Sequence, residues 1–298
     1  MTIINFSSYN KIWGYTTKPV EYDLLRFSGG ELHVRLKNPE EIKIATRVNI
    51  RANIYSSDDL MEILLVNNAI RQLSENTQTH LYLPYLPYAR QDRVCYPGEA
   101  LSLEVIVQVL RTCNFISVEV ADLHNPDARV FTKSSLVINN TEAYELISQD
   151  FFSGLRKRLE ASNIIIIAPD AGAVDRARRV ANKITKVPLP FRAAEKIRNS
   201  ETGEITGTKL VPGPSVIKGT DVLIVDDICD GGRTFVELAK ILHQEGAKSV
   251  SLYVTHGIFS KGFEPFEGLI SAVHCPFVFN EIEAFASADL HGVLLNPR

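Results

Sequence analysis

The chain has 298 residues, 45% of them hydrophobic, and this length suits one large or two ordinary domains, of which we expect two. A formal net charge of -3, with Lys and Arg spread along the chain, argues against nucleic acid as a partner. Four widely spaced cysteines, no apolar run of about 18 residues and no leader-like N-terminus predict a cytoplasmic protein with reduced thiols and no membrane contact.

Short apolar runs alternate along the chain with segments of helical periodicity. The predicted strands are residues 81–83, 118–120, 164–167, 222–225 and 251–254, and the predicted helices are residues 60–73 and 235–243. Alternation of this kind predicts parallel α/β sheets. The four isoleucines at 164–167 are apolar on both faces, so we expect that strand in the middle of a sheet with helices on both sides.

A polar stretch at residues 134–144 marks the expected domain boundary, which gives domains 1–140 and 141–298. Residues 50–72 and 225–244 share a rhythm of strand, polar loop and helix. This similarity indicates a weak internal duplication, unless it is only the chance likeness of two amphipathic helices. The second loop has Asp226, Asp227 and Asp230 where the first has Arg51, Ala52 and Ile54, so only the second loop is predicted to take part in chemistry.

The second loop combines acids, glycines and a hydroxyl at the start of a helix. Gly231 and Gly232 let the backbone turn amides toward a phosphate, and Thr234 can donate its hydroxyl beside the positive end of the helix. Asp226 and Asp227 can hold ribose hydroxyls, directly or through magnesium. An ordinary strand-to-helix turn is the alternative, but crowding carboxylates against a glycine pair costs repulsion that a turn does not need.

This pattern of hydrophobic residues, Asp-Asp, a third Asp, small residues and Thr resembles the phosphoribosyl-diphosphate motif of type I phosphoribosyltransferases and their relatives. The resemblance implies a phosphorylated ribose as ligand. It does not separate transferases, which consume phosphoribosyl diphosphate, from synthetases, which make it. The implied contacts to ribose 5-phosphate are Asp226, Asp227, Asp230, Gly231, Gly232, Arg233 and Thr234.

Residues 84–93 follow a predicted strand and end in Arg90-Gln91-Asp92-Arg93, which resembles the ATP-site signature of the phosphoribosyl-diphosphate synthetases. The two arginines can bind phosphate oxygens through paired N–H groups, and Gln91 offers the nucleotide a donor and an acceptor. Taken alone, the segment is equally an exposed, charged loop. The resemblance implies that all four residues contact ATP.

His124 and Asp170 each follow a predicted strand closely, at the edge of the sheet where α/β proteins bind ligands. The surrounding segments, residues 120–124 and 167–172, both resemble synthetase motifs. The resemblance implies that His124 and Asp170 hold the Mg2+ that accompanies ATP, and that His124 also contacts the nucleotide. A hydrogen-bonded loop histidine is the alternative for His124.

Residues 192–214 form a polar stretch that is long for a connection in a compact sheet, and such length predicts a lid. Lys196-Ile197-Arg198 within it resembles the K-x-R of the synthetases' mobile catalytic loop. The resemblance implies that Lys196 and Arg198 are catalytic and neutralise charge on the transferred diphosphate. An exposed hairpin with solvated cations is the alternative.

Two sequence positions depart from the synthetase pattern. Residues 27–31 resemble the family's F-S-D-G-E, which implies adenine-pocket contacts from Phe27, Gly29 and Glu31, but Gly29 stands where the family has aspartate. Nucleotide selectivity is therefore left open. Arg233 replaces a small residue of the phosphate loop, and it either contacts the 5-phosphate, as we expect, or points outward and stiffens the loop.

The resemblance covers nearly the whole chain, including residues 255–260. It implies an α/β protein of two similar type I phosphoribosyltransferase-like domains, each a central mostly parallel sheet flanked by helices. The first domain is expected to bind ATP and the second ribose 5-phosphate, with the last residues packing back on the first. The implied reaction moves the β,γ-diphosphate of Mg-ATP to the C1 hydroxyl of ribose 5-phosphate, giving 5-phosphoribosyl 1-diphosphate and AMP.

Two other functions remain open at this point. A phosphoribosyltransferase would need a segment that recognises a base, and the sequence shows none. A non-catalytic regulatory homologue is the second possibility, against which the presence of Lys196, Arg198, His124 and Asp170 argues. The resemblance further implies a homo-oligomer, either a dimer or a hexamer.

Overall fold

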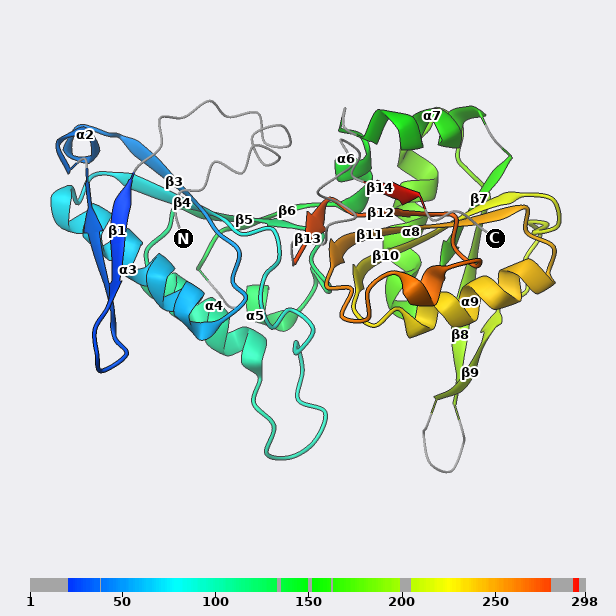
Figure 1. The fold of residues 1–298 in the computed structure, drawn as a ribbon, viewed down its shortest axis with the longest axis horizontal. Helices are drawn as coiled ribbons and strands as arrows, with labels where there is room; N and C mark the ends of the chain where they lie inside the picture. The colour runs from blue at the N-terminus through cyan, green and yellow to red at the C-terminus, as the bar shows by residue number, and fades with distance from the viewer. Residues whose placement is uncertain are drawn as a thin grey trace. The chain divides into compact units, whose positions relative to one another are not determined.

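The computed structural model describes residues 21–37, 39–132, 135–149, 152–161, 163–198, 205–279 and 292–294. The chain forms two compact units that divide between Thr141 and Glu142, and each is described by itself (Figure 1). The sequence predicted the division after residue 140. Of the last residues, which were expected to pack on the first domain, only 292–294 are among the described residues, and they pair with residues 272–274 of the second unit.

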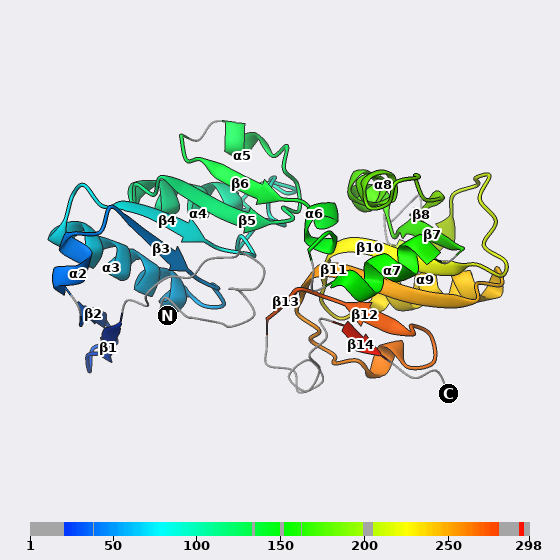
Figure 2. The same ribbon diagram turned by 90° about the horizontal axis from the view of Figure 1, so that it is seen from above.

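The first unit contains a parallel sheet of four strands, seen side by side in Figure 2. In spatial order these are β3 (Arg47–Arg51), β4 (Gln78–Tyr82), β5 (Ser117–Ala121) and β6 (Ile138–Thr141). An antiparallel hairpin precedes the sheet, made by β1 (Tyr22–Arg26) and β2 (Leu32–Leu36). The helices are α2 (Pro39–Lys43), α3 (Ser57–Leu73), α4 (Ser102–Thr112) and α5 (Arg129–Thr132). The predicted strands at 81–83 and 118–120 are confirmed as β4 and β5.

The predicted helix at 60–73 is confirmed as α3, which begins three residues earlier, at Ser57. Ser56 accepts a hydrogen bond from the Asp59 amide at 3.2 Å, and the Asp59 carboxylate accepts one from the Ser56 amide at 2.7 Å. This reciprocal pair satisfies amides that the first turn leaves without helical partners. The hydrophobic periodicity starts later than this polar cap, which explains the difference.

The second unit contains a larger sheet in the order β14-β12-β11-β10-β7-β8-β9, with β13 also pairing with β11. Neighbours from β12 to β8 are parallel, while β9 and β14 pair antiparallel with β8 and β12. The strands are β7 (Ile164–Ala168), β8 (Phe191–Arg198), β9 (Ile205–Leu210), β10 (Asp221–Cys229), β11 (Ser249–Gly257), β12 (Ala272–His274), β13 (Phe277–Val278) and β14 (Gly292–Leu294).

Helices cover both faces of this sheet, and Figure 1 shows α7 on one side and α9 on the other. Alternate residues of β7 enter two different cores: Ile164 and Ile166 pack with α7 and α8, whereas Ile165 and Ile167 pack with α9. The strand pairs with β10 on one side and β8 on the other. The predicted central position of the isoleucine run is therefore confirmed. The helical elements are α6 (Ala143–Ile147), α7 (Ser153–Ala161), η2 (Ala171–Ala173), α8 (Val174–Lys183), α9 (Arg233–Gln244) and η3 (Glu264–Phe266).

The helices of the described part of the chain include none that is long and apolar enough to cross a bilayer. The predicted helix at 235–243 is confirmed as α9, and Gly246 follows it with a φ of 85°. In the second unit, strand β10, a short loop and α9 repeat the order of β3, a loop and α3 in the first. Both units are thus parallel sheets with helical connections.

Candidate functional site

Strand β10 runs further than the sequence predicted, and this changes where the aspartate pair lies. The expected strand ended at Val225, so Asp226 and Asp227 were assigned to a loop. In the structure β10 continues to Cys229, which pairs with Gly257 of β11. The loop therefore begins at Asp230, and the two aspartates are held on a central strand.

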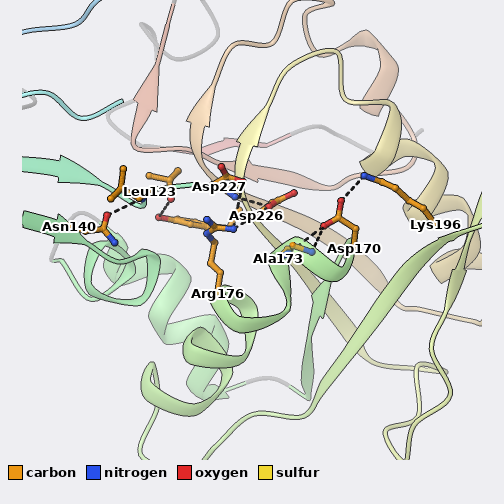
Figure 3. Close-up of polar contacts among 11 residues, drawn as sticks. Leu123, Asn140, Asp170, Ala173, Arg176, Lys196, Asp226 and Asp227 are labelled. Carbon is orange, nitrogen blue, oxygen red and sulfur yellow. Dashed lines mark hydrogen bonds and ion pairs between the residues drawn. The ribbon is translucent and has the colours of Figure 1, made fainter. Parts of the chain in front are cut away.

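Arg176, in the first turn of α8, lies beneath this aspartate pair (Figure 3). Its Nη1 atom is 3.5 Å from Oδ1 of Asp226 and 3.6 Å from Oδ1 of Asp227. Burial and, after it, the carboxylate of Asp227 raise the pKa of Asp226 well above its ordinary value, while the guanidinium lowers it. Two carboxylates and one guanidinium thus share a largely buried site.

Asp170 follows β7, and its carboxylate contacts both the turn that comes next and the side chain of Lys196. Its Oδ1 atom accepts hydrogen bonds from the amides of Gly172 at 3.0 Å and Ala173 at 3.3 Å, which caps η2. Its Oδ2 atom lies 2.6 Å from Nζ of Lys196 on β8 (Figure 3). Both side chains are more than a quarter exposed, so the pair lies at the surface of the site. The structure thus brings together one predicted metal ligand and one predicted catalytic residue.

The polar stretch expected to be a lid is, in its described part, an antiparallel hairpin. Strands β8 and β9 pair with Lys196 opposite Thr208 and Ile197 opposite Gly207. This arrangement matches the alternative of an exposed hairpin, since Glu195 and Ile197 are exposed. The lid stays a prediction. Arg198 closes β8, and residues 199–204 lie outside the described residues.

The phosphate loop consists of residues 230–232, which connect β10 to α9. Gly232 is the N-cap of α9 and has a φ of 76°, in the left-handed region. The carbonyl of Cys229 accepts hydrogen bonds from the amides of Ile258 at 2.8 Å and Phe259 at 3.2 Å, which ties the loop to the end of β11. Thr234 is half-buried and Asp230 is exposed. The positive end of α9, with the backbone amides of its first turn, suits an anion at this position.

We expect Gly232→Ala to destabilise the second unit by about 2 to 4 kcal/mol, because an added Cβ combines backbone strain with overpacking. That Cβ would lie 2.6 Å from the buried ring of Phe266. Gly219→Ala is the matched control, since Gly219 has a φ of 75° and open space around its Cα. The control should lose only about 1 kcal/mol. Denaturant unfolding of both variants measures the difference, and equal losses would contradict the clash.

Arg233 pairs along the helix that it begins. Its Nε atom is 2.7 Å from Oε1 of Glu237, and its side chain is 83% exposed. This geometry matches the interpretation in which the arginine points outward and stiffens the first turn of α9. The expected contact with a 5-phosphate stays a prediction.

In the first unit, the segment that carries Arg90 and Arg93 follows β4 as a series of turns. Arg90, Gln91 and Arg93 are exposed, whereas Asp92 keeps only 9% of its side chain exposed. Oδ2 of Asp92 accepts a hydrogen bond from Nδ2 of Asn125 at 2.5 Å. This bond links the arginine segment to the loop that follows β5.

His124 lies on that second loop and is exposed. The loop is fixed on both sides of the histidine, because Oδ1 of Asn140 accepts a hydrogen bond from the Leu123 amide at 2.9 Å (Figure 3). Asp122, at the end of β5, is buried with a φ of 47°. A left-handed non-glycine residue costs free energy, and such residues are common at functional sites. The exposed side chains of Arg90, Gln91, Arg93 and His124 thus come from adjoining loops of one unit.

Residues 27–31 form the turn between β1 and β2. The Gly30 amide donates to the Phe27 carbonyl at 2.8 Å, and the Phe27 ring is 54% exposed and lies 5.7 Å from the ring of His33. A Cβ at Gly29 would lie 2.6 Å from Oε2 of Glu31. The glutamate carboxylate therefore occupies the space into which an aspartate at position 29 would project.

Magnesium is the expected metal, and the donors proposed for it belong to different units, His124 to the first and Asp170 to the second. Within the described ranges, no three His, Cys, Asp or Glu side chains gather to hold a metal by themselves. Mg2+ in phosphoryl-transfer sites usually takes one or two carboxylates together with substrate phosphates. A carboxylate such as Asp170 fits that requirement.

Two residues that contact predicted site residues were not identified from the sequence: Arg176, beside the aspartate pair of the second unit, and Asn125, beside Asp92 of the first. A signal for Arg176 was present, because helical spacing places it on the face of α8 that also buries Ala177, Val180 and Ala181. A charged residue on a buried face needs a partner, so the position was informative. Asn125 gave no such signal, since it lies in a loop without helical or strand periodicity.

These features define a class: a phosphoribosyltransferase-like protein with an aspartate pair and a glycine loop at the carboxyl end of a parallel sheet. Residues 134–265 match a family described as the phosphoribosyl transferase domain, and residues 11–113 match the N-terminal domain of ribose phosphate pyrophosphokinase. The chain belongs to the ribose-phosphate pyrophosphokinase family, whose members are transferases.

Relatives named ribose-phosphate pyrophosphokinase support this assignment. The one from Saccharolobus solfataricus is 32% identical over 263 residues, which cover 86% of this chain and 84% of the relative. The one from Thermococcus kodakarensis is 32% identical over 247 residues, covering 82% and 80%. The fold is similar to a phosphoribosylpyrophosphate synthetase from Mycobacterium smegmatis, with a TM-score of 0.74 at 20% identity over 92% of this chain and 86% of that one. The predicted fold class and family are confirmed.

Proposed function

We propose that this protein transfers the β,γ-diphosphate of Mg-ATP to the C1 hydroxyl of ribose 5-phosphate, giving 5-phosphoribosyl 1-diphosphate and AMP. One observation carries the proposal beyond family membership. The aspartate pair, Asp170 and Lys196 lie on or just after three neighbouring strands, β10, β7 and β8. Parallel strands present their carboxyl ends at one edge of a sheet, so acceptors for a sugar adjoin a cation for a phosphate.

The sugar half of the reaction uses acceptors and amides. Asp226 and Asp227 accept hydrogen bonds from the ribose hydroxyls, and residues 230–234 bind the 5-phosphate at the start of α9. Fixing the sugar at both ends orients its C1 hydroxyl for attack. Binding energy thereby offsets the loss of translational and rotational entropy that the reaction requires. The same geometry would serve a phosphoribosyltransferase, so the nucleotide half distinguishes the two functions.

The nucleotide half requires neutralisation of charge. The C1 hydroxyl loses its proton to solvent and its oxygen forms a bond to the β-phosphorus, while the bond from that phosphorus to the α-phosphate oxygen breaks and AMP leaves with those electrons. Lys196 and Arg198 neutralise the negative charge on the moving diphosphate. Arg90, Gln91, Arg93 and His124 bind ATP from the first unit, with Phe27, Gly29 and Glu31 toward the adenine and Asp92 bracing the arginine segment.

Mg2+, when bound through Asp170 and His124, would supply further neutralisation of the phosphate charges. Asp170 already accepts a hydrogen bond from Lys196, so the carboxylate would then face two cations. We also propose a homo-oligomeric, cytoplasmic enzyme, with a dimer or a hexamer as the expected assemblies.

The test is direct: purified protein is incubated with ribose 5-phosphate, Mg-ATP and inorganic phosphate, and the products are followed by phosphorus NMR. We expect AMP and a diphosphorylated ribose in equal amounts. Turnover only when phosphoribosyl diphosphate and a base are supplied would favour a phosphoribosyltransferase instead. No reaction in either assay, together with stimulation of an active homologue, would indicate the regulatory function.

A further inference from the structure

Arg176 is a buried charge on a helix that could bury an apolar residue at the same position. It is 7% exposed and shares the buried face of α8 with Ala177, Val180 and Ala181. Burying a guanidinium is costly, and a buried ion pair is often no more stabilising than apolar packing of similar volume. Packing of the fold alone therefore does not account for an arginine here.

The guanidinium of Arg176 lies close to both aspartates. Asp226 and Asp227 are consecutive on β10, and consecutive side chains of a strand leave it on opposite faces. Nevertheless Nη1 of Arg176 lies 3.5 and 3.6 Å from one oxygen of each. The Asp227 amide also donates to Oδ1 of Asp226 at 2.9 Å. These contacts hold two carboxylates from adjacent residues around a common point.

Arg176 interacts with the two carboxylates mainly through its charge. Separations of 3.5 and 3.6 Å are those of an ion pair and exceed the usual hydrogen-bond length of about 3 Å. Arg176 therefore balances the charge of both carboxylates from below, as Figure 3 shows. Without that charge, burial and mutual repulsion would favour a shared proton, and a protonated carboxyl loses acceptor capacity.

We propose that Arg176 is a positioning residue for the sugar. Acting through Asp226 and Asp227, it keeps two neighbouring acceptors ionised and in place for the vicinal hydroxyls of ribose, and so makes the site select ribose 5-phosphate over 2-deoxyribose 5-phosphate. The proposal rests on the proposed function. It extends that function by assigning selectivity for the sugar to a residue that does not touch it.

Kinetics of Arg176→Gln, with Arg176→Lys as the conservative variant, test this proposal. The matched control is Arg179→Gln, because Arg179 lies on the same helix and pairs with Glu142 at 2.9 Å, away from the aspartates. For Arg176→Gln we expect the KM for ribose 5-phosphate to rise about tenfold or more. This is the usual effect of losing one charge-assisted hydrogen bond, here the bond from a ribose hydroxyl to an aspartate. The preference for ribose over 2-deoxyribose should fall by a similar factor, while the KM for ATP stays unchanged. Arg176→Lys should recover part of both effects.

Several results would overturn the proposal. One is a KM for ribose 5-phosphate and a sugar preference equal to those of Arg179→Gln. Another is a parallel loss of ATP and sugar binding, or loss of the cooperative thermal transition in both Arg176 variants, either of which would assign Arg176 to structure alone. Failure of the proposed function is separate, since the wild-type protein would then form no AMP from ribose 5-phosphate and Mg-ATP.

Discussion

Lys196→Ala is expected to lower kcat by about 100- to 1,000-fold, the effect seen when one preorganised charge-stabilising donor is removed from an active site. Nζ of Lys196 lies 2.6 Å from Oδ2 of Asp170, and this ion pair holds the cation at the end of β7. The KM for ATP should change little, because the arginines of the first unit carry the nucleotide in the proposed site. Initial rates of AMP formation at saturating substrates measure the effect.

Lys209→Ala provides the matched control for this variant. Lys209 lies on β9 of the same hairpin and pairs with Glu195 at 3.0 Å, with both side chains at least half exposed. An exposed pair contributes little, so the control should keep nearly full kcat and thermal stability. Near-normal turnover in Lys196→Ala would remove the catalytic assignment of Lys196. A comparable loss in both variants would instead point to the hairpin as a whole.

The fold of the second unit was predictable from sequence because its central strands are buried on both faces. The isoleucines of β7 and the apolar residues of β10 and β11 fill two cores, one beneath α9 and one beneath α7 and α8. Burial on both faces requires an uninterrupted apolar run, and such runs are typical of the strands of parallel sheets. The same argument predicts little for the hairpin of β8 and β9, whose exposed Lys and Glu side chains match a solvated loop equally well.

The end of β10 was not predictable, and the reason is a contact between distant parts of the chain. Charged residues in a central strand are unfavourable, so Asp226 and Asp227 indicate a loop when only their neighbours in sequence are considered. The structure offsets these charges with Arg176, which arrives from α8. The pattern of a single sequence does not show which residues distant along the chain will pair. For the same reason the link between Asp92 and Asn125 became visible only in the folded chain.

Asp226→Asn is expected to raise the stability of the protein while weakening its binding of ribose 5-phosphate. Burial and the carboxylate of Asp227 raise the pKa of Asp226, so its ionised form is disfavoured in the folded state. An asparagine of the same shape removes one of two repelling charges and leaves Arg176 paired with Asp227. We expect a gain of roughly 1 kcal/mol at about pH 8, or a rise in Tm of about 2 to 4 °C. The KM for ribose 5-phosphate should rise about 10- to 100-fold, because an ionised acceptor is lost.

The pH dependence separates this explanation from better packing. Because the folded pKa of Asp226 is raised, the folded wild-type protein holds its proton more tightly than the unfolded chain does. Wild-type stability thus gains from this group as the pH falls through the folded pKa, and the gain is complete below the unfolded pKa. Asparagine does not titrate, so the Tm advantage of Asp226→Asn should be largest at about pH 8 and vanish near about pH 4.

Asp221→Asn is the control for the strand itself. Asp221 begins β10, accepts a hydrogen bond from Ser249 at 2.6 Å and lies 3.5 Å from Nζ of Lys248, so its charge is favourable where it stands. Its replacement should lower the Tm slightly or leave it unchanged, and should not affect the KM for ribose 5-phosphate. A Tm advantage of Asp226→Asn that persists into acid would contradict the charge argument. An unchanged KM for ribose 5-phosphate in Asp226→Asn would show that Asp226 does not bind the ribose. The repulsion between Asp226 and Asp227 would then have another function.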